Sequence, residues 1–210
     1  MTSDVTWMPS EIKFLRALKH PMMIQKFLDS IEYSAESRYR CPRSVLRDKK
    51  AHCFDGAVFA AAMLKRIGYP PLIVDMQAVR DDDHVIAAYK KNGFWGAVAK
   101  SNFVGLRYRE PIYRDIRELV MSYFDPFYNM NYEHSLRQFA GPLDLSKYPG
   151  FEYDEELMEA IGLKLSDIPV KKILTPAQIR GLTKVDERTY RAGMMGAVRK
   201  GIYFPGKKKT

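Results

Sequence analysis

The chain has 210 residues, of which 46% are hydrophobic and 28% are charged. It is therefore long enough to bury the core of one domain, or of one domain with an appendage, which excludes a disordered peptide. No segment approaches the roughly 20 apolar residues that a membrane-spanning helix needs, and the first ten residues lack the charge and apolar order of a secretory signal. We expect a cytoplasmic protein with no membrane segment.

The chain is basic, with 34 Lys and Arg against 25 Asp and Glu and a formal net charge of +9. This charge favours anionic partners through long-range attraction. The basic residues are nevertheless spread along the chain, apart from the run Lys207-Lys208-Lys209, and no nucleic-acid-binding motif accompanies them. We therefore do not expect nucleic-acid binding, and no particular oligomeric state is predicted. The only cysteines, Cys41 and Cys53, imply no disulfide framework and suit a reducing compartment.

The first third of the chain reads as helical. Short helices are expected after Ser10, which suits an N-cap, and from Pro21, which suits a first helical turn. Residues 34–50 are polar and read as a loop with one turn of helix. The run from Phe54 to Ile67 is apolar almost all round and stops at Gly68, which predicts a buried central helix.

A small sheet is expected next. The strand-like runs occupy residues 72–79, 83–89 and 94–99. The dipeptide Asn92-Gly93 predicts a tight hairpin between the last two. Apolar residues at helical spacing over 112–124 predict a further helix.

The overall expectation is an α+β fold. Residues 1–125 would form the core with an N-terminal helical cover, and residues 126–210 a mainly helical C-terminal extension packed on that core. The helices expected in the extension are one over 154–161, one opening at Thr175-Pro176 and one over 185–199.

Two residues are candidates for nucleophilic chemistry. Cys53 stands where the polar loop meets the central helix, beside unpaired N–H groups and the positive end of the helix dipole, a place that favours thiolate. His84 opens a strand directly after three aspartates. A cysteine at a helix start and a histidine on a strand suit a Cys-His pair. The alternative is structural, because free cysteines are usually small buried apolar residues.

Three motifs carry a family resemblance: His52-Cys53-Phe54-Asp55-Gly56 leading into an Ala-rich helix, Asp83-His84-Val85, and Gly93-Phe94-Trp95-Gly96-Ala97-Val98. Their order and spacing, over residues 40–123, resemble the transglutaminase-like superfamily. The resemblance implies a papain-like core, in which a central helix packs on a small antiparallel sheet. It also implies that Cys53 is the nucleophile and His84 the general base.

The third catalytic position departs from the family pattern. The family commonly has an aspartate four residues beyond the strand tryptophan, where this chain has Ala99. In a regular hairpin His84 falls opposite Ser101, whereas Asn102 needs a bulge to turn toward the imidazole. We favour Asn102 over Ser101 as the orienting residue, because an amide oxygen is the stronger acceptor. Alternatively, both residues simply end the strand.

The resemblance implies a cysteine enzyme that acts on an amide or peptide bond through an acyl-thioester, by hydrolysis or acyl transfer, on a protein or peptide substrate. No cofactor is expected. A metal site of His84 with Asp81, Asp82 and Asp83 is not expected either, because consecutive strand residues point to alternating faces. The alternative function is a degenerate scaffold of the same fold that binds a protein or an anionic ligand, and Ala99 is its main support.

Overall fold

The structure is a computed structural model that describes residues 7–204, so the run Lys207–Lys209 lies outside the described residues. The fold is α+β. Within the described part, an antiparallel six-stranded sheet has the order β6-β5-β4-β3-β7-β8. Its strands are β3 (Leu72–Ala78), β4 (His84–Lys91), β5 (Phe94–Val98), β6 (Arg109–Tyr113), β7 (Leu136–Asp144) and β8 (Lys171–Lys172).

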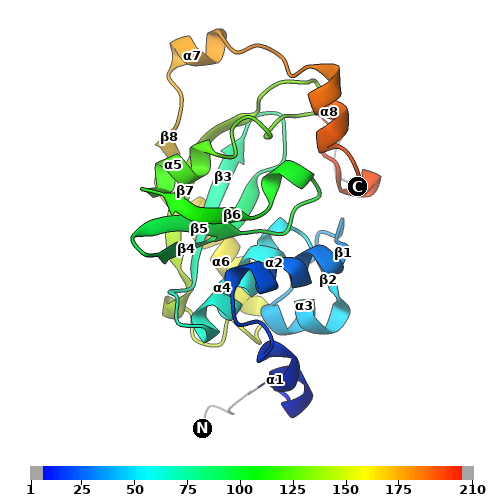
Figure 1. The fold of residues 1–210 in the computed structure, drawn as a ribbon, viewed down its shortest axis with the longest axis vertical. Helices are drawn as coiled ribbons and strands as arrows, with labels where there is room; N and C mark the ends of the chain where they lie inside the picture. The colour runs from blue at the N-terminus through cyan, green and yellow to red at the C-terminus, as the bar shows by residue number, and fades with distance from the viewer. Residues whose placement is uncertain (1–6, 205–210) are drawn as a thin grey trace.

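Helices cover both faces of this sheet (Figure 1). The helices are α1 (Pro9–Leu15), α2 (Pro21–Ser30), α3 (Pro42–Asp48), α4 (Cys53–Arg66), α5 (Ile116–Met121), α6 (Glu156–Ser166), α7 (Pro176–Arg180) and α8 (Glu187–Gly193). A short parallel pair, β1 (Glu32–Tyr33) and β2 (Lys50–Ala51), precedes α4. Between residues 7 and 204, no helix combines the length and the apolar character needed to cross a membrane.

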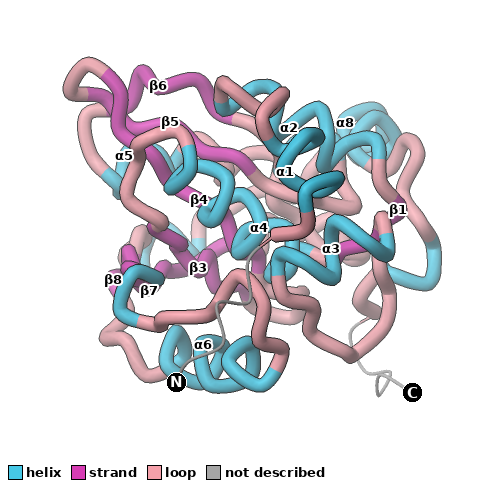
Figure 2. Tube along the Cα trace, turned by 90° about the horizontal axis from the view of Figure 1, so that it is seen from below, coloured by secondary structure: helices cyan, strands magenta, loops and turns pink. Residues whose placement is uncertain are grey.

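The predicted central helix is confirmed as α4, which begins one residue earlier than expected, at Cys53. Every residue from Phe54 to Leu64 is buried, as an all-round apolar pattern requires. Lys65 and Arg66 suit the negative end of the helix dipole, and Gly68 follows with a positive φ of 93°. Figure 2 shows α4 at the centre of the molecule, surrounded by the sheet and by α2 and α3.

The predicted hairpin is also confirmed. Lys91 pairs with Phe94, and the two turn residues Asn92 and Gly93 have φ angles of 51° and 86°. Positive φ at both positions defines a type I′ turn, which matches the twist of the flanking strands. The pairing runs regularly from this turn to Ala87, opposite Val98, and β5 ends there.

Side chains of β4 alternate between two apolar clusters. Val85, Ala87 and Tyr89 pack in the cluster that contains α4. Ile86 and Ala88 pack in the second cluster, which contains residues of α5. The sheet therefore separates two cores, and position along β4 decides which core a side chain joins.

The expected helix over 112–124 is wrong at its start. Residues 109–113 form the edge strand β6, and α5 begins only at Ile116. Asp115 caps it by accepting a hydrogen bond of 2.8 Å from the Glu118 N–H. Pro111 lies in the strand because an edge position tolerates the missing N–H donor.

The C-terminal stretch is less helical than expected. The predicted helices correspond to α6, α7 and α8, but α8 ends at Gly193 and does not reach residue 199 as expected. In addition, β7 joins the sheet beside β3 and carries β8 at its outer edge. The sequence pattern hid β7 because its pairing with β3 shifts register between Ile73 and Asp75, opposite Gly141 and Pro142. Such an irregularity interrupts the alternation that signals a strand.

Candidate active site around Cys53

A cavity of about 1190 Å³ opens at the N-terminal end of α4. The four residues that the sequence analysis selected all line it: Cys53, His84, Ser101 and Asn102. They come from the start of α4, the start of β4 and the loop that follows β5. The fold thus brings together residues that lie up to about 50 positions apart in the chain.

The Cys53 thiol rests in its neutral form. The half-buried side chain directs its S–H toward the backbone oxygen of Asp83, 3.8 Å away. Burial raises the pKa of the Cys53 thiol to about 11, and backbone N–H groups at Val85 and Phe54 lower it by less. The expectation that the helix start favours thiolate is therefore wrong for the resting state. Desolvation outweighs the helix N-terminus at this position.

The His84 imidazole is buried and neutral. Its Nε2–H donates a hydrogen bond of 2.7 Å to the backbone oxygen of Leu106, and the ring packs against Tyr123 and Phe127, 6.4 Å away between ring centroids. Burial lowers the pKa of His84 to about 4, although the bond to Leu106 raises it and Arg109 lowers it further. Because a carbonyl only accepts, Nε2 carries the proton and Nδ1 carries the lone pair.

The thiol and the imidazole approach β4 from different sides. Their hydrogen bonds, in the part of the chain described, lead to different partners: the thiol to Asp83 and the imidazole to Leu106. The aromatic neighbours of His84 belong to the cluster that contains α5, whereas Val85 packs in the α4 cluster. In the resting structure the thiol bonds to the backbone of Asp83, the residue before His84, and the two side chains form no hydrogen bond with each other.

Neither predicted orienting residue forms a hydrogen bond with the imidazole. The Asn102 carboxamide pairs with Val198, accepting from its N–H at 2.7 Å and donating to its oxygen at 3.0 Å. The Ser101 hydroxyl accepts from the Phe103 N–H at 3.0 Å. Leu106 orients the imidazole instead, with its main-chain oxygen. Sequence reasoning looked for a side-chain acceptor and had no signal for a backbone one.

Arg109 fixes the loop that carries Leu106. Its guanidinium lies 3.8 Å from the centre of the Tyr123 ring and donates to the backbone oxygens of Gly105, at 2.8 Å, and Ser122, at 3.1 Å. It thereby ties this loop to the end of α5. Arg109 was not among the predicted site residues, although an arginine in a segment rich in aromatic residues is suited to a cation–π contact of this kind.

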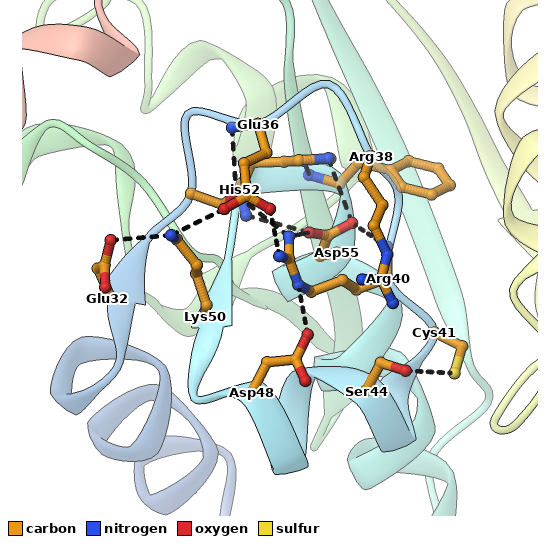
Figure 3. Close-up of polar contacts among 12 residues, drawn as sticks. Glu32, Glu36, Arg38, Arg40, Cys41, Ser44, Asp48, Lys50, His52 and Asp55 are labelled. Atoms are coloured by element: carbon orange, nitrogen blue, oxygen red, sulfur yellow. Dashed lines mark hydrogen bonds and ion pairs between the residues drawn. The ribbon is translucent and has the colours of Figure 1, made fainter.

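A buried polar network sets the first turn of α4 (Figure 3). The fully buried Asp55 carboxylate accepts from the N–H of Arg40 at 2.8 Å and of His52 at 3.3 Å, and lies 3.2 Å from His52 Nε2. His52 Nδ1 accepts from the Phe54 N–H at 3.1 Å. This arrangement is a capping box in which a histidine replaces the usual serine or threonine.

Arg40 connects this network to its surroundings. Its guanidinium is only 4% exposed and donates to Asp48 at 2.9 Å, to Ser34 at 3.2 Å and to Glu36 at 2.5 Å. It also lies 3.9 Å from Asp55. The loop before α3, helix α3 and the start of α4 are therefore held by one side chain, and Cys53 follows directly from this anchored turn.

The aspartates before His84 have structural bonds. Asp81 accepts from the Ser135 hydroxyl at 2.6 Å, and Asp83 accepts from the Ala78 N–H at 2.8 Å. Across residues 7–204, no cluster of three histidine, cysteine or carboxylate side chains is arranged to hold a metal ion.

No protein-family model matches the sequence, and no curated protein is significantly similar to it.

Proposed function

We propose that the protein is a transglutaminase-like cysteine enzyme that cleaves an amide or peptide bond through an acyl-thioester. The observation that carries this proposal is the shared cavity. Cys53 at the first position of a buried helix and His84 at the first position of the adjacent strand both line it. A papain-like core has this order of elements, in which a helix with a leading cysteine packs on an antiparallel sheet that carries the base.

The chemistry follows from the two protonation states. His84 Nδ1 accepts the thiol proton, and the sulfur attacks the carbonyl carbon to form a tetrahedral oxyanion. The backbone N–H of Cys53, at the first position of α4, would donate to that oxyanion. The amine leaves with the proton from His84, and the thioester remains. Water or a second amine then attacks the thioester, and the proton that it releases returns to sulfur.

Turnover requires one rearrangement. The Cys53 thiol must give up the Asp83 oxygen, and the start of β4 must shift so that the thiol meets Nδ1 of His84. The neutral imidazole is the correct form for this step, because only the neutral ring accepts a proton. The bond from Nε2–H to Leu106 keeps the lone pair on Nδ1 during the exchange.

A second candidate is a scaffold of the same fold that has lost turnover and binds a protein or an anionic ligand. The specific observations that favour it are Ala99 at the usual acidic position, the separate hydrogen bonds of thiol and imidazole, and the raised pKa of Cys53. In that case the thiol would be an ordinary packed group.

Intact-protein mass spectrometry separates the two candidates. Wild type is incubated with a mixture of blocked peptides, with and without a primary amine, beside Cys53→Ala and the control Cys41→Ala. Cys41 is 1% exposed and lies outside the cavity lining. The enzyme proposal expects an acyl adduct or product in wild type and Cys41→Ala only. Product in Cys53→Ala would show that Cys53 is not the nucleophile, and no product in any of the proteins would favour the scaffold.

A further inference from the structure

The last described residues return across the candidate active site. After α8 the chain runs back toward β1 (Figures 1 and 2), and residues 199–204 line the same cavity as Cys53. The backbone is extended at Val198, with φ −75° and ψ 112°, and at Ile202, with φ −101° and ψ 128°. A single turn, Arg199–Gly201, lies between them. We call residues 198–204 the strap.

Asn102 holds the strap by its main chain. One carboxamide satisfies both the N–H and the oxygen of Val198, at 2.7 and 3.0 Å, and Asn102 is only 8% exposed. A neighbouring strand would offer the same pairing, and it involves only main-chain atoms of the strap. A buried amide in this position can therefore bind a polypeptide main chain whatever its side chains are.

Gly201 fits the strap against the cavity wall. A Cβ atom at this position would lie 2.6 Å from Cε1 of Tyr33 and 3.3 Å from Nδ2 of Asn102. The first distance is well inside van der Waals contact. The strap thus lies against Tyr33 and Asn102 at a point where only a glycine fits, and both of those residues line the cavity beside Cys53.

The charges of the strap and of the cavity wall also favour binding of the strap. Arg199 and Lys200 of the strap line the cavity together with Asp81, Asp82 and Asp83. Opposite charges on the strap and on the wall favour a basic polypeptide in this place.

We propose that the part of the cavity beside Tyr33 and Asn102 is the polypeptide-binding groove of the Cys53 site, and that the strap occupies it as an intramolecular ligand. This inference rests on the proposed function, since the polypeptide that competes with the strap is the substrate. An incoming chain would take over the Asn102 pairing made by Val198, so substrate must displace the strap before it reaches the thiol.

The first test measures access to Cys53 in the full-length chain. Gly201→Ala forces the strap away from Tyr33, and Gly181→Ala, where the nearest atom lies 3.6 Å from the added Cβ, is the matched control. A bulky maleimide is applied at mildly alkaline pH, and each cysteine is read by peptide mass spectrometry. We expect Cys53 to react about tenfold faster in Gly201→Ala than in wild type or the control. Equal rates in all three folded proteins would overturn the inference.

The second test supplies the strap in trans. A fluorescent peptide of residues 196–204 is titrated into wild type, Gly201→Ala and Gly201→Ala combined with Asn102→Ala. We expect binding to Gly201→Ala alone, because wild type already holds its own strap and the double variant lacks the amide. Gly201→Ala combined with Asn131→Ala, which removes an exposed asparagine, should bind like the single variant. Equal binding with and without Asn102, or no binding at all, would contradict the proposed polypeptide-binding groove.

A further variant keeps this outcome separate from that of the proposed function. Cys53→Ala combined with Gly201→Ala should still bind the peptide, because recognition needs no thiol. If Gly201→Ala does not fold, the alkylation comparison is repeated with Asn102→Ala and with Asn131→Ala as its control. We expect faster labelling of Cys53 in Asn102→Ala. Equal labelling in both variants would overturn the inference.

Discussion

The Nε2 atom of His84 lies 2.7 Å from the backbone oxygen of Leu106. This bond fixes the imidazole as the tautomer that carries its proton on Nε2, since the carbonyl has no proton to offer. It therefore decides which nitrogen is available as a base. In the proposed mechanism, this main-chain acceptor takes the place of the asparagine or aspartate side chain of papain-like enzymes.

The pH dependence of stability reports the state of His84. Its pKa is about 4 in the folded chain, below the ordinary value of 6.5. Between these values the unfolded chain binds a proton that the folded chain does not, so stability rises with pH from about 4 to about 6.5 and is lost again as pH falls. The shift corresponds to about 3 kcal/mol at most. Urea denaturation of wild type at several pH values measures it.

His84→Gln isolates this contribution. Burial raises the pKa of Asp75 and of Asp81 to about 6 and of Asp55 to about 7, so these groups work in the opposite direction over the same range. Subtracting the variant's curve from that of wild type removes them. We expect the difference to grow from pH 4 to pH 6.5. A difference that does not change with pH would show that His84 is not a buried neutral group.

Arg40 should be a major determinant of stability near Cys53. Replacing it with methionine leaves the fully buried Asp55 without its nearest cation and releases Asp48 and Glu36. We expect a loss of about 3 kcal/mol. Arg38→Met is the control, because Arg38 is 54% exposed and pairs with Glu155 at the surface; its loss should stay below about 1 kcal/mol. Urea midpoints at constant slope give both values, and similar losses would contradict the role of Arg40.

Arg109 should control His84 through the Leu106 loop. Arg109→Lys keeps the charge but loses the planar fork that reaches Gly105 and Ser122. We expect a loss of about 1 to 2 kcal/mol in stability and amide exchange at Leu106 and its neighbours that is faster by more than this global loss explains. Arg114→Lys, at an 81% exposed side chain that pairs with Glu118, should change neither. Exchange that tracks only global stability would contradict the local role.

The sequence predicted the parts of the fold that local patterns control. The apolar run of α4, the Asn92-Gly93 turn and Pro21 at the start of α2 act within a few residues, and each was found where expected. The strand β7 was missed because its pairing depends on a distant partner and contains a register shift. Local patterns do not report such pairings.

The candidate site shows the same division. Motif order predicted that Cys53, His84, Ser101 and Asn102 share one region, and they line one cavity. It did not predict that Asn102 would bind Val198 or that Leu106 would hold the imidazole, because both bonds involve main-chain atoms whose positions follow from tertiary packing. The thiol pKa depends on burial, which the position at a helix start does not reveal.

The most direct test of the central claim is the alkylation rate of Cys53 by iodoacetamide at neutral pH, in wild type and in His84→Gln. Peptide mass spectrometry reads Cys53, with the buried Cys41 as internal reference. In the proposed mechanism the imidazole accepts the thiol proton, so the variant should react at least about tenfold more slowly. Equal rates in wild type and His84→Gln, with both proteins folded, would mean that His84 does not activate Cys53.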